Sequence, residues 1–246
     1  MKLRDSAVLF CLGVVLFCGS AAAVPVGPGS FNLGGTAVGT STGINFYFTN
    51  PGDQKGSVLL PLTGAFAGLT PGTQETIQNL TVGNGVIPGT PFNFQNWIQL
   101  SNGINLDATQ IAVNMSIPVC SGTSFDNPMA PQACRPTATS PIVLLQKGDQ
   151  AGNPNGVSAS LIINGQAHFV GSSDLTPFIG TLNAADTSFT TVSALVTAYN
   201  ANGGVPPVAY QAEFTTSTAI PEPLTMAFVG VGLLGLGLCR KTSFNR

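Results

Sequence analysis

Short segments of alternating apolar and polar residues recur through the middle of the chain. In residues 109–117, Ile111, Val113, Met115 and Ile117 would lie on one face, with the polar residues between them on the other. This two-residue period is typical of an antiparallel strand with one buried face. Other alternating or apolar segments, separated by turn-forming residues, cover 44–49, 57–62, 76–82, 94–100, 142–145, 157–163, 176–182 and 208–214.

One segment has a helical period instead. Apolar and aromatic side chains recur at Phe189, Val192, Leu195 and Tyr199, which predicts one short helix that ends near Gly203. The many short strands and frequent turns favour a mainly β domain, built as a two-sheet antiparallel β-sandwich with a jelly-roll-like arrangement. The sequence has no strict internal repeat, which disfavours a propeller or a β-helix.

The first 23 residues have the pattern of a secretory signal peptide. Lys2 and Arg4 precede an apolar run over 7–17, and small residues follow over 19–23. A segment of this kind forms an N-terminal signal helix during export and is then removed. We expect cleavage after Ala23.

A second apolar segment covers residues 224–239. It has no charged side chain and contains four glycines. As a helix it would rise about 24 Å, slightly less than the hydrocarbon core of a bilayer. Arg240 and Lys241 follow it and can reach the headgroups, which predicts a single transmembrane helix with its basic end in the cytoplasm. A buried core helix is the alternative, but the glycines would weaken it.

Just before this segment, Pro221, Glu222 and Pro223 make a stiff, extended handle; Thr225 follows, and the glycine-rich span ends at a basic pair. Together these residues resemble the PEP-CTERM sorting signal of bacterial envelope proteins. The resemblance covers 220–246 and implies processing by an exosortase, a membrane-embedded protease or transpeptidase that cuts near the handle. It also implies a transient membrane anchor and a destination at the cell surface or outside the cell. It assigns no family to the body.

The two terminal segments leave one predicted domain, residues 24–219. This domain contains three basic and eight acidic side chains, a formal charge of −5. Because no basic cluster is present, nucleic acid is not expected as a partner. Low net charge combined with ordinary hydrophobicity also argues against disorder.

Only two cysteines, Cys120 and Cys134, fall within this domain. In an oxidising compartment an isolated pair predicts a disulfide, which would stabilise the fold by about 3 kcal/mol through the entropy of the closed loop. Two thiols without a nearby histidine do not make a zinc site. The polar turn at 149–156 lacks the closing glutamate of a calcium loop, so we predict neither a metal nor a cofactor.

His168 is the only histidine, so any imidazole base must be this residue. In the register set by Leu161 and Ile163 it lies on the same face as Gln166. Ser172, Ser173 and Asp174 are close in the sequence, but the chain has no nucleophile-elbow motif G-x-S-x-G. We therefore expect an exposed or hydrogen-bonded strand histidine and no catalytic residue.

The alternation over 94–100 places Trp97 on the polar face with Gln95 and Gln99. Together with nearby aromatic residues, Trp97 could form a platform on which a sugar ring stacks. Aromatic side chains of a small β domain more often lie in the core, and the sequence leaves both interpretations open.

These features predict an exported, exosortase-sorted envelope or extracellular-matrix protein, with a non-enzymatic body associated with exopolysaccharide. The alternatives are a secreted hydrolase of glycans or esters and a plain carbohydrate-binding module. A hydrolase needs a cleft that gathers His168 or two carboxylates, whereas a matrix module should show none. An exposed Trp97 would favour the carbohydrate-binding module.

Overall fold

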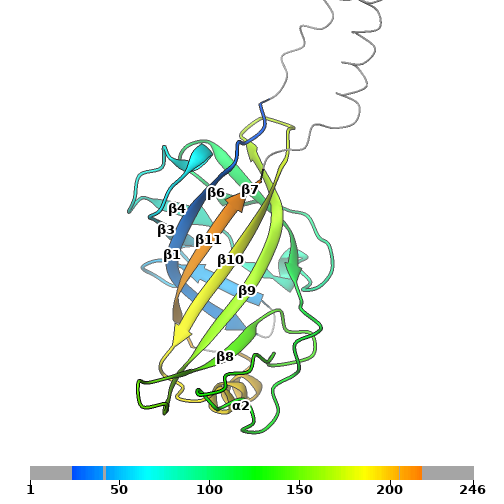
Figure 1. Ribbon diagram of the computed structural model, residues 1–246. Helices are drawn as coiled ribbons and strands as arrows, with labels where there is room; N and C mark the ends of the chain where they lie inside the picture. Colours follow the sequence, from blue (N-terminus) through cyan, green and yellow to red (C-terminus); the bar gives the residue numbers. More distant parts are fainter. Residues whose placement is uncertain (1–23, 41–42, 205, 218–246) are drawn as a thin grey trace, which may run out of the picture.

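The computed structural model describes residues 24–40, 43–204 and 206–217. The predicted signal helix and the predicted transmembrane helix lie outside the described residues. Over the described part the chain is mainly β, with one α-helix (Figure 1). The elements are β1 (Gly29–Thr40), β2 (Gly43–Tyr47), β3 (Lys55–Leu59), β4 (Gln74–Ile77), β5 (Leu80–Thr81), β6 (Phe94–Gln99), β7 (Ile104–Ala112), β8 (Val143–Gly148), β9 (Pro154–Phe169), β10 (Thr176–Asp186), α2 (Val192–Asn202) and β11 (Val208–Thr216), with short 3-10 helices at Gly64–Phe66 and Val82–Asn84.

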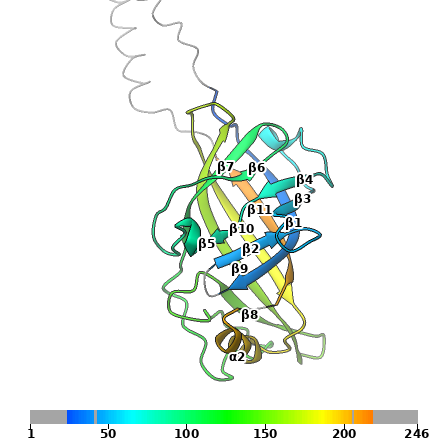
Figure 2. The ribbon, with the colours of Figure 1, turned by 180° about the vertical axis from the view of Figure 1, so that it is seen from behind.

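Eight of these strands form a closed antiparallel barrel (Figures 1 and 2). Around the ring the order is β1, β3, β4, β6, β7, β9, β10 and β11, and β11 pairs with β1 to close it. The closing pair is long, since Gly29 to Ala37 lie opposite Thr216 to Val208. Outside the ring, β2 pairs with the far half of β1, β5 pairs with β2, and β8 pairs with the first half of β9.

The structure confirms the predicted mainly β, antiparallel domain with one short helix, and differs from the predicted two-sheet, jelly-roll-like sandwich. Its strands form one continuous ring. Register shifts interrupt β6–β7 between Phe94 and Ile98, and β7–β9 between Ala108 and Gln110. Such bulges bend and twist a sheet. The bent sheet brings its two edge strands together, and hydrogen bonding between them leaves the ring no free edge.

Aromatic side chains fill the interior of the barrel. Phe31 and Phe214 stack with ring centroids 4.9 Å apart, and Trp97 meets Phe214 edge-on at 5.7 Å. On β11 the buried residues Tyr210, Ala212 and Phe214 alternate with exposed ones, as the sequence pattern predicts. Burial raises the pKa of the Tyr210 phenol above its usual range, which keeps this core side chain neutral.

Gly180 on β10 has no side chain, and the Phe214 ring packs into the space that a side chain would need. A methyl group at this position would lie 2.6 Å from the ring. We expect Gly180→Ala to lower the free energy of unfolding by about 2 kcal/mol, a usual cost of overpacking. Urea denaturation measures the effect, with Gly68→Ala as the control because its added methyl group meets open space. Equal stability of the two variants would contradict this packing.

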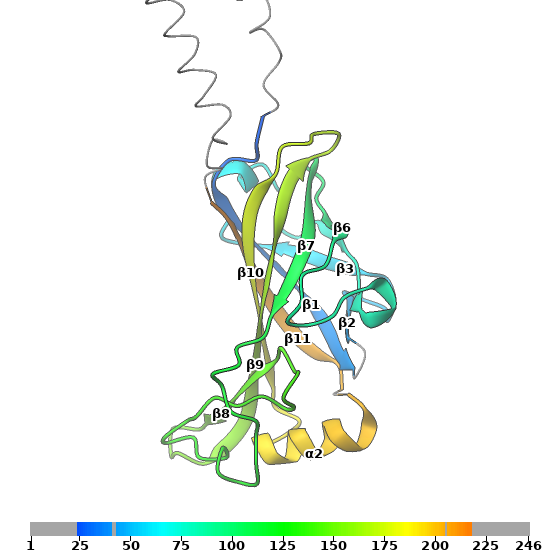
Figure 3. The same cartoon turned by 90° about the vertical axis from the view of Figure 1, so that its right-hand side faces the viewer.

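The helix and a long loop cover the end of the barrel opposite the described chain ends (Figure 3). The hydroxyl of Thr191 accepts the N–H of Ala194 at the start of α2, and Gly203 ends the helix in the left-handed conformation. A second hydrophobic cluster, separate from the barrel core, holds this part together. It consists of Phe125, Cys134, Leu144, Val157, Val192 and Leu195.

Candidate functional site

A polar cleft of about 380 Å³ lies on the outer wall of the barrel, over β6, β7 and β9. On β9, Gln166 and His168 face outward because their neighbours Gly165 and Ala167 face the interior. This confirms the face predicted for His168. The lining residues, which define the β7–β9 cleft, are Asn93, Gln95, Asn96, Asp107, Thr109, Gln166, His168, Ser172 and Leu175.

Asp107 and His168 form a nearly buried pair in the β7–β9 cleft. His168 Nε2 lies 3.3 Å from Asp107 Oδ2, and the two side chains are 15% and 13% exposed. His168 Nδ1 lies 3.1 Å from the main-chain oxygen of Phe169. Ser172 lines the same cleft, but its hydroxyl oxygen accepts the N–H of Asp174. Both imidazole nitrogens thus face acceptors, whereas a catalytic triad needs one of them to face a serine hydroxyl.

Asn96 is fixed in an uncommon backbone conformation at the rim of the cleft. Its φ is 53°, in the left-handed region that asparagine tolerates better than most residues. It lies within the β6–β7 register shift, its N–H donates to Asp107 Oδ1 over 2.6 Å, and its side-chain oxygen accepts from Asn105 over 2.6 Å. The bulge therefore places the main-chain N–H of Asn96 against the Asp107 carboxylate on β7 and its side chain against Asn105.

Three other amide side chains in the cleft are available to a ligand. Within the part of the chain that the structure describes, no hydrogen bond joins the side chains of Asn93, Gln95 or Gln166 to another residue. Each amide offers two donor hydrogens and one acceptor oxygen. The cleft therefore combines a fixed Asp107–His168 pair with free groups that can both donate and accept hydrogen bonds.

The structure contradicts the proposed role of Trp97 in sugar stacking. Its side chain is fully buried in the barrel core, and its indole N–H donates to the main-chain oxygen of Gln78 over 3.0 Å. The β6–β7 register shift beside Asn96 explains the error, because an extra residue in a strand interrupts the alternation of faces. Both Trp97 and its neighbour Ile98 consequently point inward.

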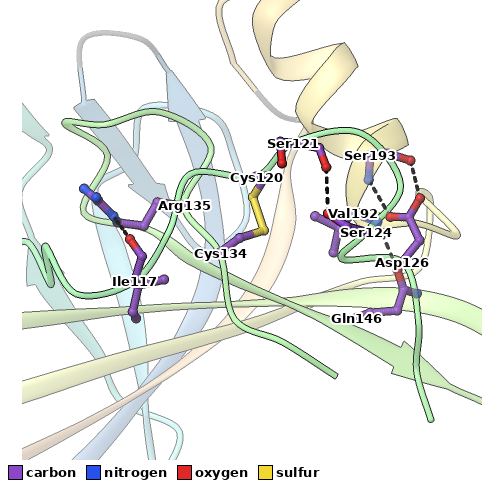
Figure 4. Close-up of a disulfide and its surroundings, with 10 residues drawn as sticks. All are labelled: Ile117, Cys120, Ser121, Ser124, Asp126, Cys134, Arg135, Gln146, Val192 and Ser193. Atoms are coloured by element: carbon purple, nitrogen blue, oxygen red, sulfur yellow. Dashed lines mark hydrogen bonds between the residues drawn. A yellow bond between two sulfur atoms is a disulfide. The ribbon is translucent and has the colours of Figure 1, made fainter. Parts of the chain in front are cut away.

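The predicted disulfide between Cys120 and Cys134 is confirmed. Figure 4 shows it at the base of the loop that reaches across to α2. From this loop the Asp126 carboxylate accepts both the N–H and the hydroxyl of Ser193, in the first turn of α2. A carboxylate at a helix N-terminus satisfies N–H groups that have no partner within the helix. The disulfide-closed loop thus supplies a cap for α2.

Gln146 and Arg135, near the disulfide, are two buried polar side chains that hydrogen-bond to the main chain. The Gln146 amide donates to the main-chain oxygens of Gly156 and Thr190. It also accepts the N–H of Val192 (Figure 4). Arg135 is 4% exposed, and its guanidinium donates to the main-chain oxygen of Ile117 over 2.9 Å. Both side chains hold main-chain segments in place, and we assign them structural roles.

The predicted sorting-signal residues Pro221, Glu222, Pro223, Thr225, Arg240 and Lys241 lie outside the described residues. Among the helices that the structure describes, none is long and apolar enough to cross a membrane. The described residues also include no cluster of three or more His, Cys, Asp or Glu side chains with the geometry of a metal site.

The fold and the cleft define a small closed antiparallel β-barrel with a polar outer cleft and a disulfide-braced end. Comparisons with protein-family models, curated proteins and solved structures found no match. Function therefore has to be argued from the cleft residues and from the two terminal sequence signals.

Proposed function

We propose that this is an exported, exosortase-sorted protein of the cell surface or extracellular matrix, whose non-enzymatic barrel binds exopolysaccharide in the β7–β9 cleft. The signal pattern at 1–23 and the sorting-signal resemblance at 220–246 support export and sorting. The observation that carries the binding proposal is the set of unpaired amides beside the fixed Asp107–His168 pair.

The chemistry of the cleft favours a neutral, hydroxyl-rich ligand. A sugar hydroxyl both donates and accepts hydrogen bonds, as do the amides of Gln95 and Gln166. The one carboxylate that lines the cleft, Asp107, is already paired with His168. The remaining polar groups of the cleft are therefore suited to orienting a neutral molecule. The formal charge of −5 on residues 24–219 disfavours a polyanion by long-range repulsion.

Two amide side chains provide a direct test. We expect the double variant Gln95→Ala, Gln166→Ala to bind the matrix polysaccharide about tenfold more weakly, because each lost hydrogen bond is worth roughly 0.5–1.5 kcal/mol. Sedimentation of the 24–219 body with purified polysaccharide measures the affinity. Gln211→Ala is the matched control, since Gln211 is exposed on β11, outside the cleft. If the double variant and the control bind alike, the cleft is not the binding site.

Sorting has a separate test. In a host with an exosortase, mass spectrometry of the mature protein should find a C-terminus near Pro221–Pro223. A Glu222→Ala variant should keep residues up to Arg246 attached and stay in the membrane fraction. Intact mature protein ending at Arg246 without the substitution would count against sorting.

An ester hydrolase is the second candidate function, because the cleft gathers His168, Asp107 and Ser172, contrary to the absence of such a cleft expected of a matrix module. It would require the imidazole to turn from its present acceptors toward the Ser172 hydroxyl. A glycosidase would need two carboxylates, and Asp107 is the only acidic residue that lines the described cleft. Ester hydrolysis that Ser172→Ala abolishes would replace the binding proposal with this one.

A further inference from the structure

The two ends of the described chain lie together beside the hairpin that joins β9 and β10. The hydroxyl of Thr176, at the start of β10, donates to the main-chain oxygen of Val26 over 2.9 Å. The N–H of Ser217 donates to the main-chain oxygen of Pro177 over 3.2 Å. Figures 1 and 3 show this end of the barrel opposite α2. The chain therefore leaves the barrel next to this hairpin.

The loop of this hairpin, residues 170–175, exposes apolar side chains; we call it the β9–β10 tip. Val170 is 68% exposed and Leu175 is 52% exposed. Val24, at the same end of the barrel, is 70% exposed. Asp174 is the only charged residue of the tip, so the tip carries no positive charge that would attract anionic headgroups.

The sequence places the predicted membrane segment close to this end. Pro221 is the fourth residue after Ser217, and Leu224, which begins the apolar segment, is the seventh. An extended chain covers at most about 3.3–3.6 Å per residue, so the end of the barrel can lie no more than about 25 Å from the hydrocarbon boundary. The two prolines stiffen this connection.

We propose that, while the tail spans the membrane, the β9–β10 tip docks on the outer lipid surface through Val170 and Leu175. This inference rests on the proposed function, since it requires residues 224–239 to insert. The partner is the bilayer itself. The tip contacts it through apolar side chains, without electrostatic attraction to charged headgroups. Removal of the tail releases the body from this surface.

The test uses the chain from Val24 to Arg246 in zwitterionic vesicles whose acyl chains carry bromine, which quenches tryptophan. Val170→Trp reports on the tip, Leu233→Trp reports on insertion of the tail, and the protein without a new tryptophan supplies the Trp97 background. Met129→Trp is the matched control: Met129 is 76% exposed and lies against Gly152 at the α2 end. A circular dichroism spectrum confirms that each variant is folded.

We expect Leu233→Trp and Val170→Trp to be quenched, the latter about twofold or more above Met129→Trp, because an interfacial side chain enters the bilayer by roughly 5–10 Å. Quenching of Leu233→Trp alone, with Val170→Trp matching Met129→Trp, would overturn docking and leave the proposed function standing. Absence of quenching at Leu233→Trp would overturn both docking and the membrane step of sorting.

Discussion

Trp97→Ala is expected to lower the free energy of unfolding by about 4 kcal/mol, the usual cost of removing a large aromatic side chain from a core. The Trp97 ring is fully buried between Phe46, Phe178 and Phe214. Its removal leaves a cavity and deprives the main-chain oxygen of Gln78 of its donor. Urea denaturation followed by far-UV circular dichroism measures the change.

Trp97→Phe is the control for this prediction. It keeps an aromatic ring in the core but loses the indole N–H, so its cost should be smaller than that of Trp97→Ala. A surface platform for sugar would behave differently. If Trp97→Ala kept full stability and lost polysaccharide binding, the side chain would have to face solvent.

Removal of the disulfide has the second largest expected effect. Replacing both Cys120 and Cys134 with alanine should lower the free energy of unfolding by about 3 kcal/mol, because the unfolded chain regains the entropy of an open loop. The two cysteines are 14 residues apart. The open loop would also hold Asp126 less firmly against Ser193, so amide hydrogen exchange in α2 should rise more than in the barrel strands.

Met129→Ala is the control in the same loop, since its side chain is 76% exposed and its loss should change stability little. Urea denaturation and amide hydrogen exchange are measured for this control as well, in oxidising buffer so that its disulfide stays formed. Unchanged stability of the double cysteine variant would show that the disulfide does not brace this end. Unchanged exchange in α2 would contradict the capping role of Asp126.

The strand pattern of the sequence predicts most of the barrel wall, because alternation follows from which side chains face the core. It succeeds for 157–163 and 208–214, where the alternating residues that it places inward include the buried Val157, Leu161, Ile163, Tyr210, Ala212 and Phe214. It fails beyond Ala112, where β7 ends. Met115 continues the alternation but is 73% exposed, since an apolar period does not by itself supply a neighbouring strand.

Closure of the sheet could not be predicted from the sequence. It depends on pairing between β1 and β11, which are far apart in the chain, and local patterns carry no information on such long-range contacts. The bulge at Asn96 is another such feature. It moves Trp97 from the polar face to the core, and only its unusual backbone conformation reveals it.

The sequence predicts only part of the candidate site. The outward face of His168 follows from the register of β9, as predicted. Its partner Asp107 is 61 residues away, and no spacing rule connects the two residues. The free amides of Gln95 and Gln166 are common polar residues whose importance emerges only when the strands bring them to one cleft.

The central claim is that the β7–β9 cleft binds a neutral, hydroxyl-rich chain. The most direct measurement is a nuclear magnetic resonance titration of the ¹⁵N-labelled 24–219 body with oligosaccharides cut from the matrix polysaccharide. We expect the largest shift changes at Asn96, Gln166 and His168. Changes confined to the far side of the ring, at Asn32 on β1 and Gln211 on β11, or no change at saturating ligand, would contradict it.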